Sequence, residues 1–321
     1  MKNIIRTVNG DIAPEPWGFT NAHSHLNCSL SEEFSDHALY SDYASGDANY
    51  LYEDTFEDFT EFSKSGGFAL VDTTPIGLSR NPSNLLDASV KTNTNIVAAT
   101  GIYHEPFIPK VISGKNQKEI TEHFIKEITS GIGDTNIKAG IIKIATYKGP
   151  ITDLEKRIFR SAASASIETG TSITTHTYLG ENALEQVDLL VTNGVKPDKI
   201  VIGHLDDNKI NLNLIRKIID KGAYAQFDAI GCEYYSKRLN SQMPSDDERI
   251  SAIKQLRADG LIDRIMIGSD LCLKKHLKKN GGPGYEHLVK KFLFNCLDRG
   301  LNENIMNNIL ILNPSKILTI S

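Results

Sequence analysis

The chain has few cysteines, no long apolar run and no excess of positive charge. Its cysteines are widely spaced and form no CxxC pair, so we predict reduced thiols and no disulfide framework: Cys28, Cys232, Cys272 and Cys296. No stretch approaches the ~18 apolar residues of a membrane span. The N-terminal stretch MKNIIRTVNGDIAPEP lacks the apolar centre of a signal peptide. We therefore expect a cytoplasmic protein with no membrane partner.

The balance of charge also excludes a class of partners. The chain has 35 basic and 40 acidic residues and a net charge of −5, which gives no basic field for nucleic acid. With 321 residues and 40% hydrophobic content, it can bury a large core. We expect chemistry on a small molecule and no nucleic-acid partner. The sequence leaves the oligomeric state open, a homodimer included.

Eight short apolar segments, each followed by helix-forming sequence, dominate the chain. They are predicted as strands at 17–26, 68–75, 95–103, 139–146, 172–177, 199–205, 224–230 and 264–270. This alternation, without a linker or tandem repeat, predicts an α/β fold: a single (β/α)8 TIM barrel over residues 1–321. A doubly wound sheet usually carries a glycine-rich loop after its first strand, where this chain reads NAHSHL.

Two segments fall outside the alternation. Residues 27–60 are polar, aromatic and acidic, and are too long for a simple connection, so we predict an inserted loop or lid over the site. Residues 302–321 are predicted as an extra C-terminal helical segment that Asn313-Pro314 interrupts.

The segment AGIIKIAT, residues 139–146, places a lysine inside a buried strand. Side chains alternate along a strand, so Ile141, Lys143 and Ala145 share one face, and Ile142 and Ile144 share the other. Desolvation of a bare ammonium costs several kcal/mol or lowers its pKa by ~3–5 units. Lys143 must therefore be paired, neutral or chemically modified.

Other chemically active side chains occur where the predicted strands end. They are His23, His25, His176, His204 and Asp270. In a barrel they converge with Lys143 at the C-terminal mouth, the face where barrel enzymes carry their chemistry. Imidazole and carboxylate ligands suit Zn²⁺, Mn²⁺, Fe²⁺ or Co²⁺. Reaction of Lys143 with carbon dioxide would give a carbamate, an anion whose two oxygens can bridge two metals.

At these residues the sequence resembles the phosphotriesterase-like family of the amidohydrolase superfamily, especially its lactonases for phosphorylated sugars. The shared motifs are HSH at 23–25, AGIIKIAT at 139–146, TTHT at 174–177, IGHLDD at 202–207 and IGSD at 267–270. The resemblance implies two divalent metals, most simply zinc. It implies that His23, His25 and Asp270 bind one metal, that His176 and His204 bind the other, and that carboxylated Lys143 bridges both.

The resemblance also implies a mechanism. A hydroxide that bridges the metals would attack the substrate, and Asp270 would take its proton and pass it to the leaving group. Many relatives read HEH where this chain reads HSH, so Ser24 removes a carboxylate from the outer face of the strand and leaves the metal site intact.

The substrate is predicted from the loops. Tyr103 matches a tyrosine that lactone-hydrolysing relatives carry near the metals, where a phenol can hold a lactone oxygen or the leaving alkoxide. The residues after 270 include Lys274, Lys275, His276 and a GGPG turn, and this stretch resembles relatives that open phosphorylated sugar lactones. Lys237 with Arg238 could add to the same basic patch. We therefore predict an anionic small-molecule substrate.

The predicted activity is that of a lactonase acting on a phosphorylated sugar lactone, such as a pentono-1,4-lactone 5-phosphate. A phosphotriesterase, or another carboxylic or phosphate ester hydrolase, could use the same centre. A Schiff-base aldolase would explain the buried Lys143 without metals, but it leaves the histidines unused. A non-catalytic binding protein is the remaining alternative.

Overall fold

Eight parallel strands form the centre of the fold in the computed structural model, which describes residues 3–29, 50–237 and 239–321. Neighbouring strands follow the order β12-β9-β8-β7-β6-β5-β4-β3. Their bounds are β3 Thr20–Ser24, β4 Ala69–Asp72, β5 Asn95–Gly101, β6 Ile141–Ala145, β7 Ile173–His176, β8 Ile200–Ile202, β9 Tyr224–Phe227 and β12 Ile265–Ile267. Each lies within a segment that the sequence predicts as a strand.

The two edge strands of this sheet, β3 and β12, meet and close it into a barrel. The backbone N–H groups of Ser269 and Asp270 both donate to the carbonyl of His23, each at 3.0 Å. Gly268 is required at this contact, because a Cβ there would lie 2.7 Å from the backbone nitrogen of His23. The predicted TIM barrel is confirmed.

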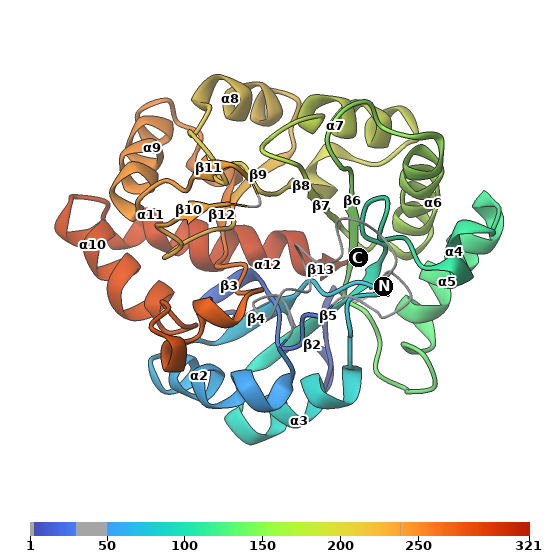
Figure 1. The fold of residues 1–321 in the computed structure, drawn as a ribbon, viewed down its shortest axis with the longest axis horizontal. Coiled ribbons are helices and arrows are strands. Elements are labelled where there is room, and N and C mark those ends of the chain that lie inside the picture. Colours follow the sequence, from blue (N-terminus) through green and yellow to red (C-terminus); the bar gives the residue numbers. More distant parts are fainter. Residues whose placement is uncertain (1–2, 30–49, 238) are drawn as a thin grey trace.

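Helices surround the barrel (Figure 1). Their bounds are α2 Tyr52–Lys64, α3 Pro82–Thr92, α4 Lys110–Ser113, α5 Gln117–Thr129, α6 Asp153–Thr169, α7 Ala183–Thr192, α8 Leu212–Asp220, α9 Asp246–Ala258 and α10 Leu293–Asp298. Helix α6 shows how the sequence sets these ends. Thr152 and Glu155 form a capping box at its start, and Gly170 ends it with φ +74°.

Shorter elements lie between these helices and strands or, as with η6 (Leu288–Phe292) before α10, continue directly into one of them. They are the 3-10 turns η2 Pro197–Lys199, η3 Ile262–Arg264, η4 Lys274–His276 and η5 Lys278–Asn280, the π-helix η6 Leu288–Phe292, and the hairpin strands β10 Tyr235–Ser236 and β11 Ser241–Gln242. Two of them, η4 and the hairpin, follow β12 and β9 and border the barrel mouth.

The alternation predicted for β6 is confirmed. Ile141 packs in a cluster inside the barrel, whereas Ile142 and Ile144 pack in a second cluster with apolar residues of the surrounding helices. Lys143 shares the inward face with Ile141 and is 2% exposed.

A small sheet that the sequence analysis did not predict brings the two ends of the chain together. Strand β1, Ile4–Thr7, pairs antiparallel with β2, Gly10–Ile12, and with β13, Thr319–Ile320. Ile5 and Leu318 pack into the cluster inside the barrel. The base of the barrel is therefore closed by both ends of the chain.

Two predictions outside the barrel need correction. The segment 27–60 is not a loop throughout, because α2 begins at Tyr52, and residues 30–49 lie outside the described part of the chain. Residues 302–321 end in β13, and Pro314 does not interrupt the helix. The chain runs through α11 Glu303–Asn307, the π-helix η7 Asn308–Leu312 and α12 Asn313–Leu318, where Pro314 occupies the first turn and its missing N–H costs no bond within α12.

Two further expectations concern cysteines and membranes. All four cysteines are free thiols, as predicted. Within the described ranges, no helix is long and apolar enough to cross a membrane.

Candidate metal centre

Four histidines predicted as ligands come together at the mouth of the barrel. The ring centres of His23 and His25 are 5.4 Å apart, those of His23 and His204 are 5.0 Å apart, and those of His204 and His176 are 4.1 Å apart. All four side chains are buried. They come from the ends of β3, β7 and β8, so the barrel forms one continuous group of imidazoles from distant parts of the chain.

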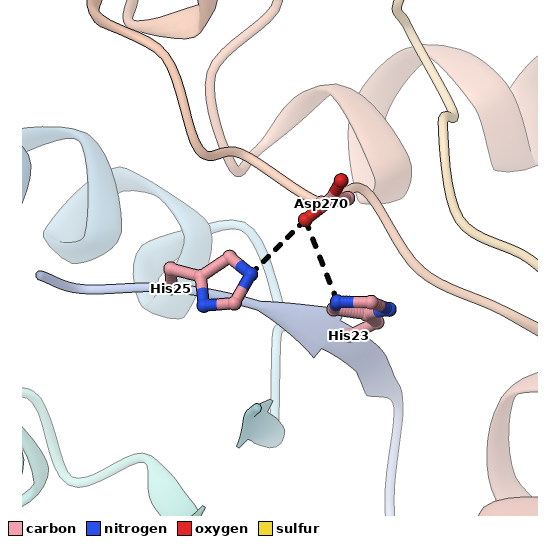
Figure 2. Close-up of side chains that lie close together, drawn as sticks. All are labelled: His23, His25 and Asp270. Carbon is pink, nitrogen blue, oxygen red and sulfur yellow. Dashed lines mark hydrogen bonds and ion pairs between the residues drawn. The ribbon is translucent and has the colours of Figure 1, made fainter. Parts of the chain in front are cut away.

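Asp270 faces two of these histidines (Figure 2). Its Oδ1 lies 3.0 Å from Nε2 of His25 and 3.4 Å from Nε2 of His23. The three side chains form one of the two groups that could hold a metal within the described residues. This is the set that the family resemblance implies for one ion.

The second group contains a residue that the sequence analysis missed. It consists of His23, His204 and Asp228, whereas the family resemblance implies His176 with His204. Asp228 is fully buried after β9, its Oδ1 is 2.9 Å from Nδ1 of His23, and its Oδ2 accepts the backbone N–H of His204 at 2.6 Å. A carboxylate near the end of the segment predicted as a strand, 224–230, is the signal that could have identified it.

Asp228 orients His23. Because Nδ1 of His23 faces Asp228, Nε2 is directed at Asp270, where a metal would lie. A carboxylate behind a ligating imidazole fixes the tautomer and raises the basicity of the ligand. Asp228 therefore suits a supporting role better than direct ligation.

The surroundings shift the pKa values of two of the histidines in opposite directions. Burial, together with the Lys143 ammonium, lowers the pKa of His23 to about 4. Burial would also lower the pKa of His204, but the Asp207 carboxylate 3.1 Å from Nδ1 raises it to about 9. A neutral His23 is ready to act as a ligand, whereas His204 must release a proton when it binds a metal.

Two of the predicted ligands have an unusual backbone conformation. His204 has φ +58° and Asp270 has φ +38°, in the left-handed region that costs a residue other than glycine roughly 1–2 kcal/mol. Such a conformation persists only where the surrounding contacts hold it. Both residues direct their side chains into the same group of imidazoles, so the strain coincides with the candidate site.

Lys143 is a buried polar group of the site that the surrounding protein satisfies poorly. Its Nζ is buried and has no hydrogen-bond partner among the described residues. Burial lowers its pKa, while the carboxylates of Asp228, Asp270 and Asp207 oppose that shift. An uncompensated amine beside buried imidazoles fits poorly in a structural role. This position instead suits a lysine whose side chain is carboxylated and helps to hold cations.

The residues present therefore fit a pair of divalent metals. The donor set is imidazole and carboxylate, which suits first-row transition ions, and carboxylation would convert the orphaned amine of Lys143 into an anionic ligand. His176 is placed beside His204 although it belongs to neither compact group, so it remains a candidate ligand of the second ion.

Tyr103 lies beside this group on the loop after β5. Its ring centre is 5.2 Å from that of His176 and 3.9 Å from that of His104. The His104 ring in turn stacks on Tyr147, 4.5 Å between centres. Tyr103 is therefore part of an aromatic wall that extends from the imidazoles along the mouth.

The three lysines predicted to bind phosphate have different surroundings. Lys237 is exposed in the turn between β10 and β11. The charge of Lys274 acts on Asp54 in α2 and lowers the pKa of that carboxyl, although a hydrogen bond from Lys279 lowers it more. Lys275 places its Nζ 3.6 Å from the ring centre of Tyr234. Arg238 lies outside the described residues.

Lys275 is linked to Asp270 through a short series of contacts. Nε2 of His276 is 2.8 Å from the Tyr234 hydroxyl, and Nδ1 accepts the N–H of Cys272 at 3.3 Å. Sγ of Cys272 is 3.7 Å from Oδ2 of Asp270. His276 belongs to the basic stretch that was predicted after Asp270, whereas Tyr234 was not predicted as a site residue, since only the fold brings the loops after β9 and β12 together.

Comparison with known proteins extends this picture. The profile of the phosphotriesterase family matches residues 3–318. A phosphotriesterase homology protein of Escherichia coli (strain K12) is 35% identical over 303 residues, which cover 94% of this chain and 98% of that protein. An N-acetyltaurine hydrolase of Dictyostelium discoideum is 34% identical, over 81% of this chain and 71% of that protein.

Solved structures show the same architecture along nearly the whole chain. The phosphotriesterase homology protein from Escherichia coli, crystallised with phosphate in its active site, superposes with a TM-score of 0.84 at 34% identity and covers 95% of this chain and 99% of that one. A lactonase from Listeria monocytogenes has a TM-score of 0.87 at 27% identity, over 99% of both chains.

Proposed function

Because the chain belongs to the phosphotriesterase family of hydrolases, we propose that it is a lactonase with two metals that opens a phosphorylated sugar lactone. The observation that carries the metal-dependent part is the convergence of four histidines, Asp270 and the orphaned Lys143 at the barrel mouth. The similarity to a lactonase over 99% of both chains supports the choice of reaction.

In this proposal His23, His25 and Asp270 hold one cation, His176 and His204 hold the other, and carboxylated Lys143 joins them. Two such ions would lower the pKa of a water molecule and polarise the carbonyl of the lactone. Asp270 accepts the proton of the attacking water and returns it to the ring oxygen as the carbon–oxygen bond breaks. The phenol of Tyr103 is placed to hold that oxygen.

Lys275 and Tyr234 are the best-placed groups for the anionic end of the substrate. Since the N–H of Cys272 can only donate, Nδ1 of His276 accepts, and the imidazole proton lies on Nε2 and is donated to Tyr234. The hydroxyl hydrogen of Tyr234 is thus directed away from His276. An ammonium beside a phenol, joined to Asp270 through His276 and Cys272, suits an oxyanion such as phosphate.

The metal content tests the proposal most directly. Protein purified from metal-supplemented medium is expected to carry roughly two divalent ions per chain and to lose its hydrolase activity when a chelator removes them. Elemental analysis and activity assays on the same sample give the answer. Full activity in a sample without metal would overturn the assignment and return attention to the Schiff-base aldolase.

Substitution of Lys275 tests the anion site. Lys275→Ala should lower kcat/KM for a phosphorylated lactone. The expected loss of transition-state stabilisation is ~1.5–3 kcal/mol, the range for a hydrogen bond to a charged group. The same lactone without phosphate should react almost unchanged. Lys237→Ala and Lys274→Ala serve as comparisons, because Lys237 is exposed in the hairpin turn and the charge of Lys274 acts on Asp54. Equal losses on both substrates in all three variants would favour a neutral lactone.

A second activity has specific support. The relative from Dictyostelium discoideum is an N-acetyltaurine hydrolase, and a sulfonate would find the same ammonium and phenol donors as a phosphate. An assay panel of phosphorylated lactones, neutral lactones, a phosphotriester and N-acetyltaurine separates these activities. A preference of kcat/KM for the amide over every lactone would replace our proposed substrate with an N-acyl amine that carries an anionic group.

A further inference from the structure

A buried chain of hydrogen bonds joins the loop after β12 to the end of β3. The backbone N–H of Leu271 donates to Oγ of Ser24 at 3.2 Å. The Ser24 hydroxyl is hydrogen-bonded to Tyr285, whose own hydroxyl donates to the carbonyl of His25 at 2.5 Å. Because each hydroxyl accepts one bond and donates another, the chain runs in one direction from Leu271 to His25.

This chain lies wholly inside the protein. Ser24 and Tyr285 are both completely buried, so water does not replace a bond that is lost there. From the sequence, Ser24 was expected on the outer face of its strand and away from the metal site. The structure places its hydroxyl against the residue that follows Asp270, and the Tyr50 hydroxyl donates to the carbonyl of that same residue, Leu271.

The segment held in this way is the strained one. Asp270 has φ +38°. The backbone N–H groups of Ser269 and Asp270, which precede that of Leu271, both donate to the carbonyl of His23. Three consecutive amides are therefore bound by two consecutive residues, His23 and Ser24. His23 itself faces Asp270, and His25, the other histidine that faces it, directly follows Ser24.

We propose that Ser24 is a positioning residue that holds Asp270 in its left-handed conformation and so sets the geometry of the metal site formed by His23, His25 and Asp270. The part of this inference that concerns metal rests on the proposed function. Ser24 does not touch the ion. It acts through the amide of Leu271, and Tyr285 completes its hydrogen bonds and links them to the backbone of His25.

The experiment compares Ser24→Ala with Ser89→Ala. Ser89 is also a buried serine, and its hydroxyl donates to the carbonyl of Thr94 away from the mouth, so both variants lose a buried hydroxyl with its hydrogen bonding. Apoprotein is titrated with Co²⁺, followed by calorimetry and by the visible absorption of the bound ion. A crystal structure of each apo variant gives the backbone conformation at residue 270.

Ser24→Ala is expected to weaken the binding of one of the two Co²⁺ ions by ~10–100-fold, the usual effect of removing an outer partner of a ligand, and to change its absorption. Residue 270 should leave the left-handed region. Ser89→Ala should bind both ions as the unaltered protein does. Equal Co²⁺ affinities in both variants, with residue 270 unmoved, would overturn the inference.

Two further outcomes keep the test decisive. If Ser24→Ala does not fold, Tyr285→Phe is used, because it retains the ring and removes the next hydroxyl of the chain. It should weaken the same ion, and unchanged affinity would count against the inference. If the unaltered protein takes up no Co²⁺, the proposed function fails, and the backbone at residue 270 in the apo variants alone decides the role of Ser24.

Discussion

Lys143→Ala is expected to lose both metals and to lower kcat/KM for the best substrate of the panel by at least ~10³-fold, about 4 kcal/mol in transition-state free energy. The reason is the position of its amine, which is buried on the inward face of β6 and has no hydrogen-bond partner among the described residues. Carboxylation would make this side chain an anion between the two cations. Without that bridge, each ion is left with mostly neutral imidazoles.

Chemical rescue distinguishes a bridging role from a general loss of structure. A small carboxylic acid added to Lys143→Ala can fill the vacated space and should restore part of the metal content and activity. Lys199→Ala is the matched control, since Lys199 is partly buried and donates to the carbonyl of Thr319 in the strand that pairs with β1. An active, metal-loaded crystal with density for an unmodified amine at Lys143 would contradict carboxylation.

Asp270→Asn is expected to reduce kcat by ~10²–10⁴-fold, the range for loss of a positioned proton acceptor. The amide has nearly the same shape, but it cannot take a proton from the attacking water, and it removes the negative charge 3.0 Å from His25. The histidines hold the pKa of Asp270 well below its usual range, against the effect of burial, so the carboxyl group is ionised at neutral pH.

Metal content separates the two roles of this residue. If the variant retains both ions and still loses activity, proton transfer accounts for the loss, and if one ion is lost, ligation contributes. Asp263→Asn is the control, because Asp263 is exposed, accepts a hydrogen bond from Asn308 and precedes β12, whereas Asp270 follows it. Activity of Asp270→Asn within about threefold of the unaltered protein would exclude Asp270 as the base.

Much of the fold could be predicted from local patterns. Each barrel strand contains a short buried run, and features such as the Thr152–Glu155 capping box and Gly170 mark the helix ends. The small sheet of β1, β2 and β13 could not be predicted in this way, because its pairing of Ile4 with Ile320 joins the two ends of the chain. Its strands are too short to show an alternating pattern.

The residues of the candidate site could likewise be predicted only in part. Histidines and an aspartate at strand ends, with a lysine in the middle of a buried run, identified the ligand types and their face of the barrel. Asp228 also follows a barrel strand but was missed, because the segment predicted as that strand, 224–230, runs past it, whereas β9 ends at Phe227. Its contact with His23 depends on two strands that lie far apart in the chain.

The sequence by itself determined the barrel, the inward direction of Lys143 and the set of candidate metal-binding side chains, because strand periodicity and strand ends are local properties. Only the tertiary structure decided that Asp228 supports His23, that Lys275 lies over Tyr234 and that Ser24 holds the amide after Asp270. Each of these contacts joins different loops or strand ends, and some rest on backbone angles that local propensity disfavours. Such contacts exist only once the barrel closes and its packing outweighs the local cost.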